Sequence, residues 1–238
     1  MISPIEGQPQ LADTHQYVMH KIFLLDDHPM LRNGLRDLFS NAKGYEVCGE
    51  ASTVAEGRTA IASTAPDLIV MDLTLPDGSG LEFLKELREA DDTVLVLVFS
   101  MHDELIYAQR VIRAGGKGYL VKGASPEKIL QAAGKVLSGA IHLSDKAARH
   151  ILNNMSPGGR KVQSKLEALS DREVEVFQLL GLGMASSEIA YKLGISPRTI
   201  DAHRRNIRTK LGLLDSLAVN RQAVIWVEST GNQGNQTP

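Results

Sequence analysis

Five short apolar runs alternate with helix-length amphipathic segments over the first 140 residues, and no other feature constrains the fold as strongly. Strands that are apolar almost throughout are buried on both faces, as in parallel sheets covered by helices. Because crossovers between parallel strands are right-handed, the alternation predicts a doubly wound, five-stranded α/β domain over residues 20–140. The runs are KIFLLD (21–26), YEVCGEA (45–51), DLIVMD (67–72), TVLVLVFS (93–100) and GYLVK (118–122).

No strand-like run follows the fifth, and only short helical segments occupy residues 166–228. Between the two regions, SPGGRKVQSK (156–165) is rich in turn-forming and basic residues, so we predict a linker over residues 141–165. Residues 1–19 and 229–238 are predicted to be a flexible leader and a flexible tail. The sequence therefore predicts an α/β domain, a linker and a small all-helical domain.

The composition is that of a globular protein, with 43% hydrophobic residues and a formal net charge of −2. No apolar run approaches the ~20 residues that a membrane helix needs. The first residues also lack the basic and apolar regions of a signal peptide. The one cysteine, Cys48, cannot form an internal disulfide, which fits a reducing compartment. We therefore expect a cytoplasmic protein without a membrane partner.

Polar side chains lie where the predicted strands end. Asp26 and Asp27 follow the first strand, Asp72 follows the third, Ser100 ends the fourth and Lys122 ends the fifth. Parallel strands end on one edge of the sheet, so these side chains should converge there. Crowded carboxylates need a cation, and an all-oxygen ligand set suits Mg²⁺. With the charge neutralised, Asp72 can attack a phosphoryl group, whose oxygens Ser100 and Lys122 could then hold.

Each of these residues has a simpler alternative role, since a polar side chain at a strand end often caps the next helix. Capping alone does not explain why all five lie at strand ends and none lies within an element. A phosphatase of the haloacid dehalogenase type also has a nucleophilic aspartate after an apolar strand, but it needs a second aspartate where this chain has Thr74. GGKGY (115–119) lacks the spacing and the Ser or Thr of a Walker A loop.

This half of the chain resembles the receiver domain of bacterial two-component response regulators, whose fold is flavodoxin-like or CheY-like. The matching stretches are LLDDHPMLRNGL, LIVMDLTLPDGSGLEFL, LVFSMHDE and AGGKGYLVKGAS. The resemblance implies that Asp72 accepts a phosphoryl group from a sensor histidine kinase. It also implies that Mg²⁺ is held by Asp26, Asp27, Asp72 and the backbone carbonyl of Thr74.

The same resemblance implies a switch, in which Ser100 and Tyr119 respond to the phosphoryl group that Lys122 helps to hold. Such a receiver assists only its own phosphorylation and dephosphorylation, so the protein is not expected to be an enzyme. Receivers of other subclasses often have a proline after the lysine. Here Gly123 follows Lys122, which excludes a cis-proline at that position.

SPRTIDAHRRNIRTKLG (196–212) is predicted to be a helix with Ser196 as its N-cap. At about 100° per residue, Ile200, Ile207 and Leu211 share one narrow stripe and the opposite arc is basic. The helix carries five basic residues and one acid, a net charge of +4 (5 − 1). Taken alone, this pattern fits a solvated face of a helical bundle. After a preceding helix and a short turn, it fits a helix-turn-helix.

The stretches LSDREVEVFQLL and SEIAYKLGISPRTIDAHRRNIRTKLG, with their spacing, resemble the LuxR-type DNA-binding domain. The resemblance covers about residues 166–228 and implies that the third of four helices lies in the major groove of double-stranded DNA. By position, it implies that Asp201, Ala202 and Arg205 face base edges. The residues that would approach phosphates, or that lie on the same basic arc, are Ser196, Arg198, Thr199, Arg204, Arg208 and Lys210.

Two positions depart from the LuxR-type pattern. Ala185 stands where a Ser or Thr usually caps the helix that carries Glu188. Either Ser186 caps that helix one residue later, or the helix loses ~1 kcal/mol of capping. Asp201 stands where a lysine often reads a base, which leaves the target sequence open without arguing against DNA binding.

The order of receiver, linker and LuxR-type domain resembles transcriptional response regulators of the NarL/FixJ class. It implies that phosphorylation changes the pairing of domains or protomers, so that a homodimer occupies two DNA half-sites. Leu217, Val224 and Trp226 form an acid-free stripe that is either the dimer seam or plain core. Two alternatives stay open, a receiver that acts through protein contacts alone and a DNA-binding regulator that works without phosphate.

Overall fold

The computed structural model describes residues 19–155, 166 and 168–231. Most of the predicted flexible ends and the whole of SPGGRKVQSK (156–165) lie outside the described residues. The first domain contains β1 (His20–Leu25), α1 (Pro29–Asn41), β2 (Tyr45–Ala51), α2 (Val54–Thr64), β3 (Leu68–Met71), β4 (Thr74–Leu75), β5 (Gly78–Ser79), α3 (Gly80–Ala90), β6 (Leu95–Ser100), α4 (Glu104–Arg113), β7 (Gly118–Val121) and α5 (Pro126–Leu137). It is followed by α6 (Asp145–Met155), α8 (Asp171–Gly181), α9 (Ser186–Lys192), α10 (Pro197–Leu211) and α11 (Ser216–Gly231).

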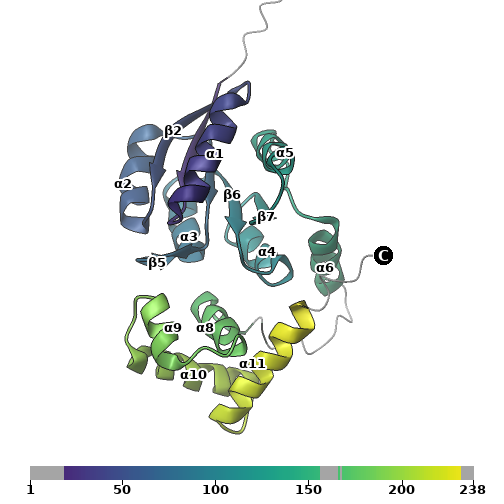
Figure 1. Cartoon of the computed structure of the whole chain (residues 1–238). Helices are drawn as coiled ribbons and strands as arrows, with labels where there is room; N and C mark the ends of the chain where they lie inside the picture. The colour runs from purple at the N-terminus through teal and green to yellow at the C-terminus, as the bar shows by residue number, and fades with distance from the viewer. Residues whose placement is uncertain (1–18, 156–165, 167, 232–238) are drawn as a thin grey trace, which may run out of the picture.

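All five predicted strands are present, and they form one parallel sheet in the order β2-β1-β3-β6-β7. Side chains alternate between the two faces of the sheet. In β1, Ile22 and Leu24 belong to the core under α1 and α5, whereas Phe23 and Leu25 belong to the core under α2, α3 and α4. Figure 1 shows these helices around the sheet, and the predicted doubly wound α/β class is confirmed.

A two-stranded hairpin that the sequence did not predict follows the third sheet strand. Its strands β4 and β5 pair antiparallel, and the carboxylate of Asp77 in the turn accepts the backbone N–H groups of Val54 (2.7 Å) and Ala55 (3.0 Å) at the start of α2. Gly80 then begins α3 so close to the preceding loop that a Cβ there would collide with the carbonyl of Asp72. Only glycine therefore allows α3 to begin directly against Asp72, the residue that follows β3.

Part of the predicted linker is a helix attached to the first domain. Before α6, the N–H of His142 donates to the carbonyl of Lys117 (2.9 Å), and the N–H of Tyr119 donates to the carbonyl of His142 (2.9 Å). At the start of α6, the N–H and hydroxyl of Ser144 donate to the carboxylate of Glu104 (2.9 and 2.6 Å). The segment between the domains thus adds a short backbone pairing to β7 and covers α4.

The second domain is all-helical, as predicted (Figure 1). Helix α8 begins with a capping box, in which the hydroxyl of Ser170 accepts from the N–H of Glu173 and the Glu173 carboxylate accepts from the N–H of Ser170. The stripe predicted on α10, formed by Ile200, Ile207 and Leu211, is buried against the other helices. No helix in the described part of the chain is long and apolar enough to cross a membrane.

Helix α9 begins without a side-chain cap, which is the second of the two predicted alternatives. Its N-cap residue is Ala185, and the carboxylate of Glu188 accepts the N–H of Ala185 (2.7 Å). Ser186 is the first residue of the helix rather than its N-cap, and its hydroxyl accepts a hydrogen bond from Arg204 (2.9 Å). Ser186 thus joins α9 to α10 instead.

Candidate functional site

A group of charged side chains lies at the carboxyl edge of the sheet. Lys122 follows β7, and its ammonium lies 2.7 Å from a carboxylate oxygen of Asp26 and 2.7 Å from one of Asp72. Both carboxylates are nearly buried, with exposed fractions of 2% for Asp26 and 3% for Asp72. Asp27 lies beside them with a half-buried side chain. The structure thus brings together four residues that are up to 96 positions apart (122 − 26).

The charges in this group do not balance. Burial alone would lower the pKa of Lys122, but the attraction of Asp72 and Asp26 outweighs burial and raises the pKa above its ordinary value. The ammonium is therefore charged at neutral pH. With all three carboxylates ionised, one ammonium leaves a net charge of −2 (1 − 3) at the edge, which favours a further cation.

Ser100 and Tyr119 lie next to this group on β6 and β7. The hydroxyl of Ser100 is buried and makes no hydrogen bond within the described part of the chain. Such an oxygen is costly unless it receives a partner, and a phosphoryl oxygen would supply one. Tyr119 is fully buried, its hydroxyl donates to the backbone carbonyl of His102 (2.8 Å), and burial raises its pKa well above the ordinary value.

His28 is a member of the group that sequence reasoning missed. Its Nδ1 lies 2.7 Å from a carboxylate oxygen of Asp27 and 3.2 Å from one of Asp26. The signal was present in the sequence, because His28 directly follows the two aspartates and begins the turn into α1. Its side chain is 61% exposed, so it lies at the rim rather than beneath the carboxylates.

The donor set fits a hard divalent cation. One oxygen from each of Asp26, Asp27 and Asp72, together with a ring nitrogen of His28, lie within 4.8 Å of one another. Carboxylate oxygens at a net negative edge suit Mg²⁺, which is held in proteins by one or two carboxylates and keeps several waters. The structure also places Thr74 two residues beyond Asp72, at the start of the hairpin.

Helix α10 carries the residues predicted to contact DNA. The side chains of Arg198, Asp201 and Arg205 are exposed, whereas Ala202 and Arg208 are partly covered. Ser196 accepts the N–H of Thr199 as the N-cap of the helix, and the two hydroxyls lie 2.8 Å apart. The remaining two predicted residues, Arg204 and Lys210, are placed differently.

Arg204 and Lys210 are bound to side chains of their own domain. Arg204 donates to the hydroxyl of Ser186 on α9 and to the side-chain carbonyl of Asn220 on α11 (3.1 Å). Lys210 lies 2.7 Å from the buried carboxylate of Glu173, and this bond holds α10 to the start of α8. Both cations thus hold α10 against its neighbours.

The stripe predicted on α11 is partly core and partly exposed, so neither predicted alternative, dimer seam or plain core, holds for all three of its residues. The ring of Trp226 packs against that of Phe177 on α8, with centroids 5.2 Å apart, so it belongs to the core. Leu217 and Val224 are exposed by 72% and 37%, which leaves them available to a partner.

Comparison with known proteins identifies both domains. Residues 22–134 match the family model described as "Response regulator receiver domain". Residues 167–223 match the model described as "Bacterial regulatory proteins, luxR family". The Response regulator UvrY of Escherichia coli (strain K12) is 30% identical over 207 residues, which cover 87% of this chain and 94% of UvrY. The chain is a response regulator of the NarL/FixJ class.

Other relatives of this response regulator agree with that class. The nitrate/nitrite response regulator protein NarL of Escherichia coli (strain K12) is 32% identical over 206 residues, which cover 87% of this chain and 94% of NarL. Among solved structures, a LuxR-family two-component response regulator from Aurantimonas sp. SI85-9A1 is 35% identical, covers 57% of this chain and 97% of its own, and has a TM-score of 0.54. RcsB of Salmonella typhimurium, at 21% identity, covers 89% of this chain and 98% of its own with a TM-score of 0.63, which supports the fold. The two domains of this chain are those of a phosphorylation-dependent transcription regulator.

Proposed function

We propose that Asp72 accepts a phosphoryl group from a sensor histidine kinase and that this event switches dimerisation and DNA binding. One observation carries the proposal: the ammonium of Lys122 binds the buried carboxylates of both Asp72 and Asp26, while the buried hydroxyl of Ser100 has no hydrogen-bond partner among the described residues. A nucleophile, a cation for the transferring group and a free donor are thus assembled on one edge.

Each side chain at this edge has a definite role in the proposed reaction. Asp26, Asp27, Asp72 and the carbonyl of Thr74 would hold Mg²⁺, which neutralises charge on the phosphoryl group when bound. A carboxylate oxygen of Asp72 attacks the phosphorus, and the bond from phosphorus to the donor's leaving group breaks. Lys122 stays beside the acyl phosphate and keeps one oxygen neutralised, and Ser100 donates its hydroxyl to another.

The phosphoacceptor can be tested with a small phosphodonor. Incubated with Mg²⁺ and acetyl phosphate, the wild-type chain should gain one acid-stable, hydroxylamine-labile phosphate, measured by intact mass. Asp72→Asn should gain none, since an amide cannot attack the phosphorus. Equal labelling of the variant, or labelling of wild type that persists after the metal is chelated, would contradict the assignment.

For the second domain, we propose that α10 binds double-stranded DNA in the major groove, as a homodimer formed on phosphorylation. In support, RcsB, which shares this fold, has been solved bound to the promoter rprA in the presence of the phosphomimetic BeF3-, and as two dimers bound to two parallel DNAs. The exposed arc with Arg198, Asp201 and Arg205 is the surface that this chain offers for base contacts. The exposed Leu217 and Val224 on α11 are the proposed dimer seam. We place the protein in the cytoplasm, where its kinase partner and DNA are accessible.

Two alternatives predict different results in a DNA-binding experiment. If the receiver acts through protein contacts alone, a promoter fragment should not be retarded in a gel by the phosphorylated chain. If the regulator works without phosphate, Asp72→Asn and wild type should retard the fragment equally with acetyl phosphate present. Our proposal requires retardation that acetyl phosphate strengthens in wild type and leaves unchanged in Asp72→Asn.

A further inference from the structure

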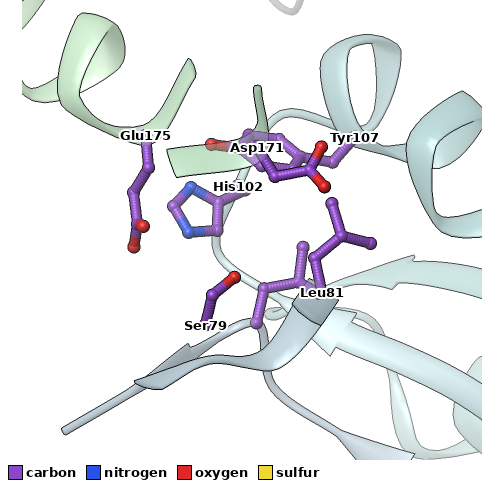
Figure 2. A pocket seen from close by; sticks show the side chains of 7 residues that line it. Ser79, Leu81, His102, Tyr107, Asp171 and Glu175 are labelled. Carbon is purple, nitrogen blue, oxygen red and sulfur yellow. The ribbon is translucent and has the colours of Figure 1, made fainter. Parts of the chain in front are cut away.

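The carboxyl edge of the sheet has two flanks with different surroundings. On the β6 side it borders the pocket shown in Figure 2, which is lined by residues of both domains, among them His102 and Tyr107. On the β2 side it ends at the turn that joins β1 to α1, which contains Asp26 and Asp27. Helix α1 places Arg32 against this turn. The proposed reaction gives Arg32 no role, although it is the cation in contact with the turn.

Arg32 holds a backbone carbonyl at the phosphorylation edge. Its Nη1 donates to the carbonyl of Asp26 (2.5 Å), which belongs to the peptide bond between Asp26 and Asp27. Its Nε donates to the carboxylate of Glu50 near the end of β2 (3.2 Å). The side chains of Arg32 and Glu50 are only 18% and 22% exposed. Because the guanidinium is planar and both bonds are made, it has little freedom to turn, and it holds the carbonyl in one orientation.

The two aspartates of the turn depend on this peptide bond to different degrees. The side chain of Asp26 is anchored directly, since its Oδ1 accepts the N–H of His28 (2.8 Å) and its Oδ2 lies 2.7 Å from the ammonium of Lys122. The Oδ1 of Asp27 is buried, lies 2.7 Å from the Nδ1 of His28 outside hydrogen-bond geometry, and accepts no hydrogen bond within the described part of the chain. The position of the Asp27 carboxylate is therefore set mainly by its backbone, which follows the carbonyl that Arg32 holds.

We propose that Arg32 is a positioning residue for cation binding at the edge, and that it acts by fixing the peptide bond that places Asp27. The inference rests on the proposed function, since the cation is the one that the reaction at Asp72 would use. A buried carboxylate oxygen without a partner, such as Oδ1 of Asp27, gains one when a cation binds. With Arg32 in place the backbone of Asp27 is already ordered in the free protein, so binding loses less entropy.

A purely electrostatic role for Arg32 predicts the opposite result. Arg32, Arg36 and Glu50 together carry a net charge of +1 (2 − 1), which repels a divalent cation. If only this charge mattered, removal of either arginine would strengthen cation binding. If Arg32 positions Asp27, its removal weakens cation binding. The sign of the change therefore distinguishes the two roles.

Arg36 provides a matched control on the same helix. It lies one turn beyond Arg32, and its Nη1 is 3.1 Å from the other carboxylate oxygen of Glu50. Its Nη2 donates to the side-chain carbonyl of Asn33. Neither contact reaches the peptide bond that Arg32 holds. Arg36→Ala thus removes the same charge from the same partner and leaves that peptide bond in place.

The test measures binding of Mn²⁺, a paramagnetic substitute for Mg²⁺, to the full chain without a phosphodonor. The EPR signal counts the free ion, and Asp27→Asn, which removes the ligand, measures binding elsewhere on the chain. Arg32→Ala should raise the dissociation constant at the edge about tenfold, as the loss of a group that orients a metal ligand does. Arg32→Lys should raise it severalfold, because an ammonium keeps the charge but lacks the planar fork. Arg36→Ala should leave it within about twofold of wild type, because that side chain is exposed and its charge is screened.

A second readout is labelling by acetyl phosphate over a range of Mg²⁺ concentrations. In Arg32→Ala, the Mg²⁺ concentration for half-maximal labelling should rise about tenfold, as the dissociation constant does. The labelling rate at saturating Mg²⁺ should fall much less, because Asp72 keeps its contact with Lys122. A general loss of structure would lower the saturating rate instead.

Wild-type Mn²⁺ affinity in either Arg32 variant, or an equal loss of affinity in Arg36→Ala, would overturn the role of Arg32. Tighter binding by Arg32→Ala would also overturn it, because that is the electrostatic result. Each of these outcomes leaves the phosphoacceptor standing if acetyl phosphate still labels Asp72 in wild type. A wild-type chain that binds no more Mn²⁺ than Asp27→Asn would overturn the proposed metal site itself, and the role of Arg32 with it.

Discussion

The carboxyl edge of the sheet and helix α10 both gather charge, but they are built in different ways. The edge takes one or two residues from each of several segments, and its charges are buried and face each other. Helix α10 carries its charges on one continuous element, and most of them are exposed. At the edge, removing one charge therefore leaves its buried partners without a counter-charge. On α10, each cation pairs only with the neighbour that its own long side chain reaches. This difference predicts how substitutions in the two regions should behave.

The largest effect is expected at the edge, for Lys122→Ala. Removing the ammonium leaves the carboxylates of Asp26 and Asp72 buried and without their cation, which should lower the free energy of unfolding by about 3–5 kcal/mol. Urea denaturation without divalent metal would measure the loss, and adding Mg²⁺ should restore part of it. The control is Lys135→Ala on the exposed face of α5, which should change stability by less than ~0.5 kcal/mol. Equal effects of the two variants would mean that the edge is not electrostatically coupled.

Arg204 and Arg205 test whether different residues of α10 contact DNA and hold the helix in its domain. Arg205→Ala should weaken binding to the cognate site by ~1–3 kcal/mol and leave stability unchanged, because its side chain is exposed. Arg204→Ala should weaken binding to all sequences and also lower the melting temperature, since it loses its bonds to Ser186 and Asn220. Titration with DNA at several salt concentrations, beside thermal unfolding, distinguishes them. If the two variants have the same melting temperature, the bonds of Arg204 do not hold the helix.

Asp201 should have a smaller and more selective effect. An acid that faced bare phosphate would repel DNA, so we expect it either to accept from a cytosine amino group or to orient a neighbouring arginine. Asp201→Ala should therefore relax sequence preference while raising non-specific affinity. Selection of binding sites with variant and wild type would measure both. Recovery of the same site with the same stringency would make Asp201 a bystander.

The smallest effect is a dependence of stability on pH that arises within the helical domain. Burial would raise the pKa of Glu173, but the bonds from Lys210 and from the N–H of Ser170 outweigh it and lower the pKa below 4.5. A lowered carboxyl pKa stabilises the fold above pH 4.5 and stops doing so as the pH falls through the folded value. Fluorescence of the single tryptophan, Trp226, should therefore report a melting temperature that falls below pH 4.5. In Glu173→Gln this fall should be weaker, and an unchanged pH profile would remove Glu173 from the explanation.

The sheet and the residues at its carboxyl edge could be predicted because all strands of a parallel sheet run in the same direction. Apolar runs define the strands, and parallel strands end on the same side, so the placement of Asp72 and Lys122 follows from order along the chain. The hairpin of β4 and β5 could not be predicted, since two-residue strands have no periodicity. On α10, the helical period places Arg204 and Lys210 on the polar arc, but it does not show that their side chains reach Asn220 and Glu173. Such pairings depend on how the helices pack, which no local pattern contains.

The backbone pairing between His142 and β7 also protects the sheet from other chains. An edge strand with unpaired N–H and carbonyl groups is a template for aggregation. Here the N–H of Tyr119 and the carbonyl of Lys117 are occupied by His142, which lies beyond the last helix of the receiver. A fragment cut at residue 140 would expose that edge, whereas one that continues to residue 155 would keep it covered. We therefore expect the shorter receiver fragment to self-associate more than the longer one.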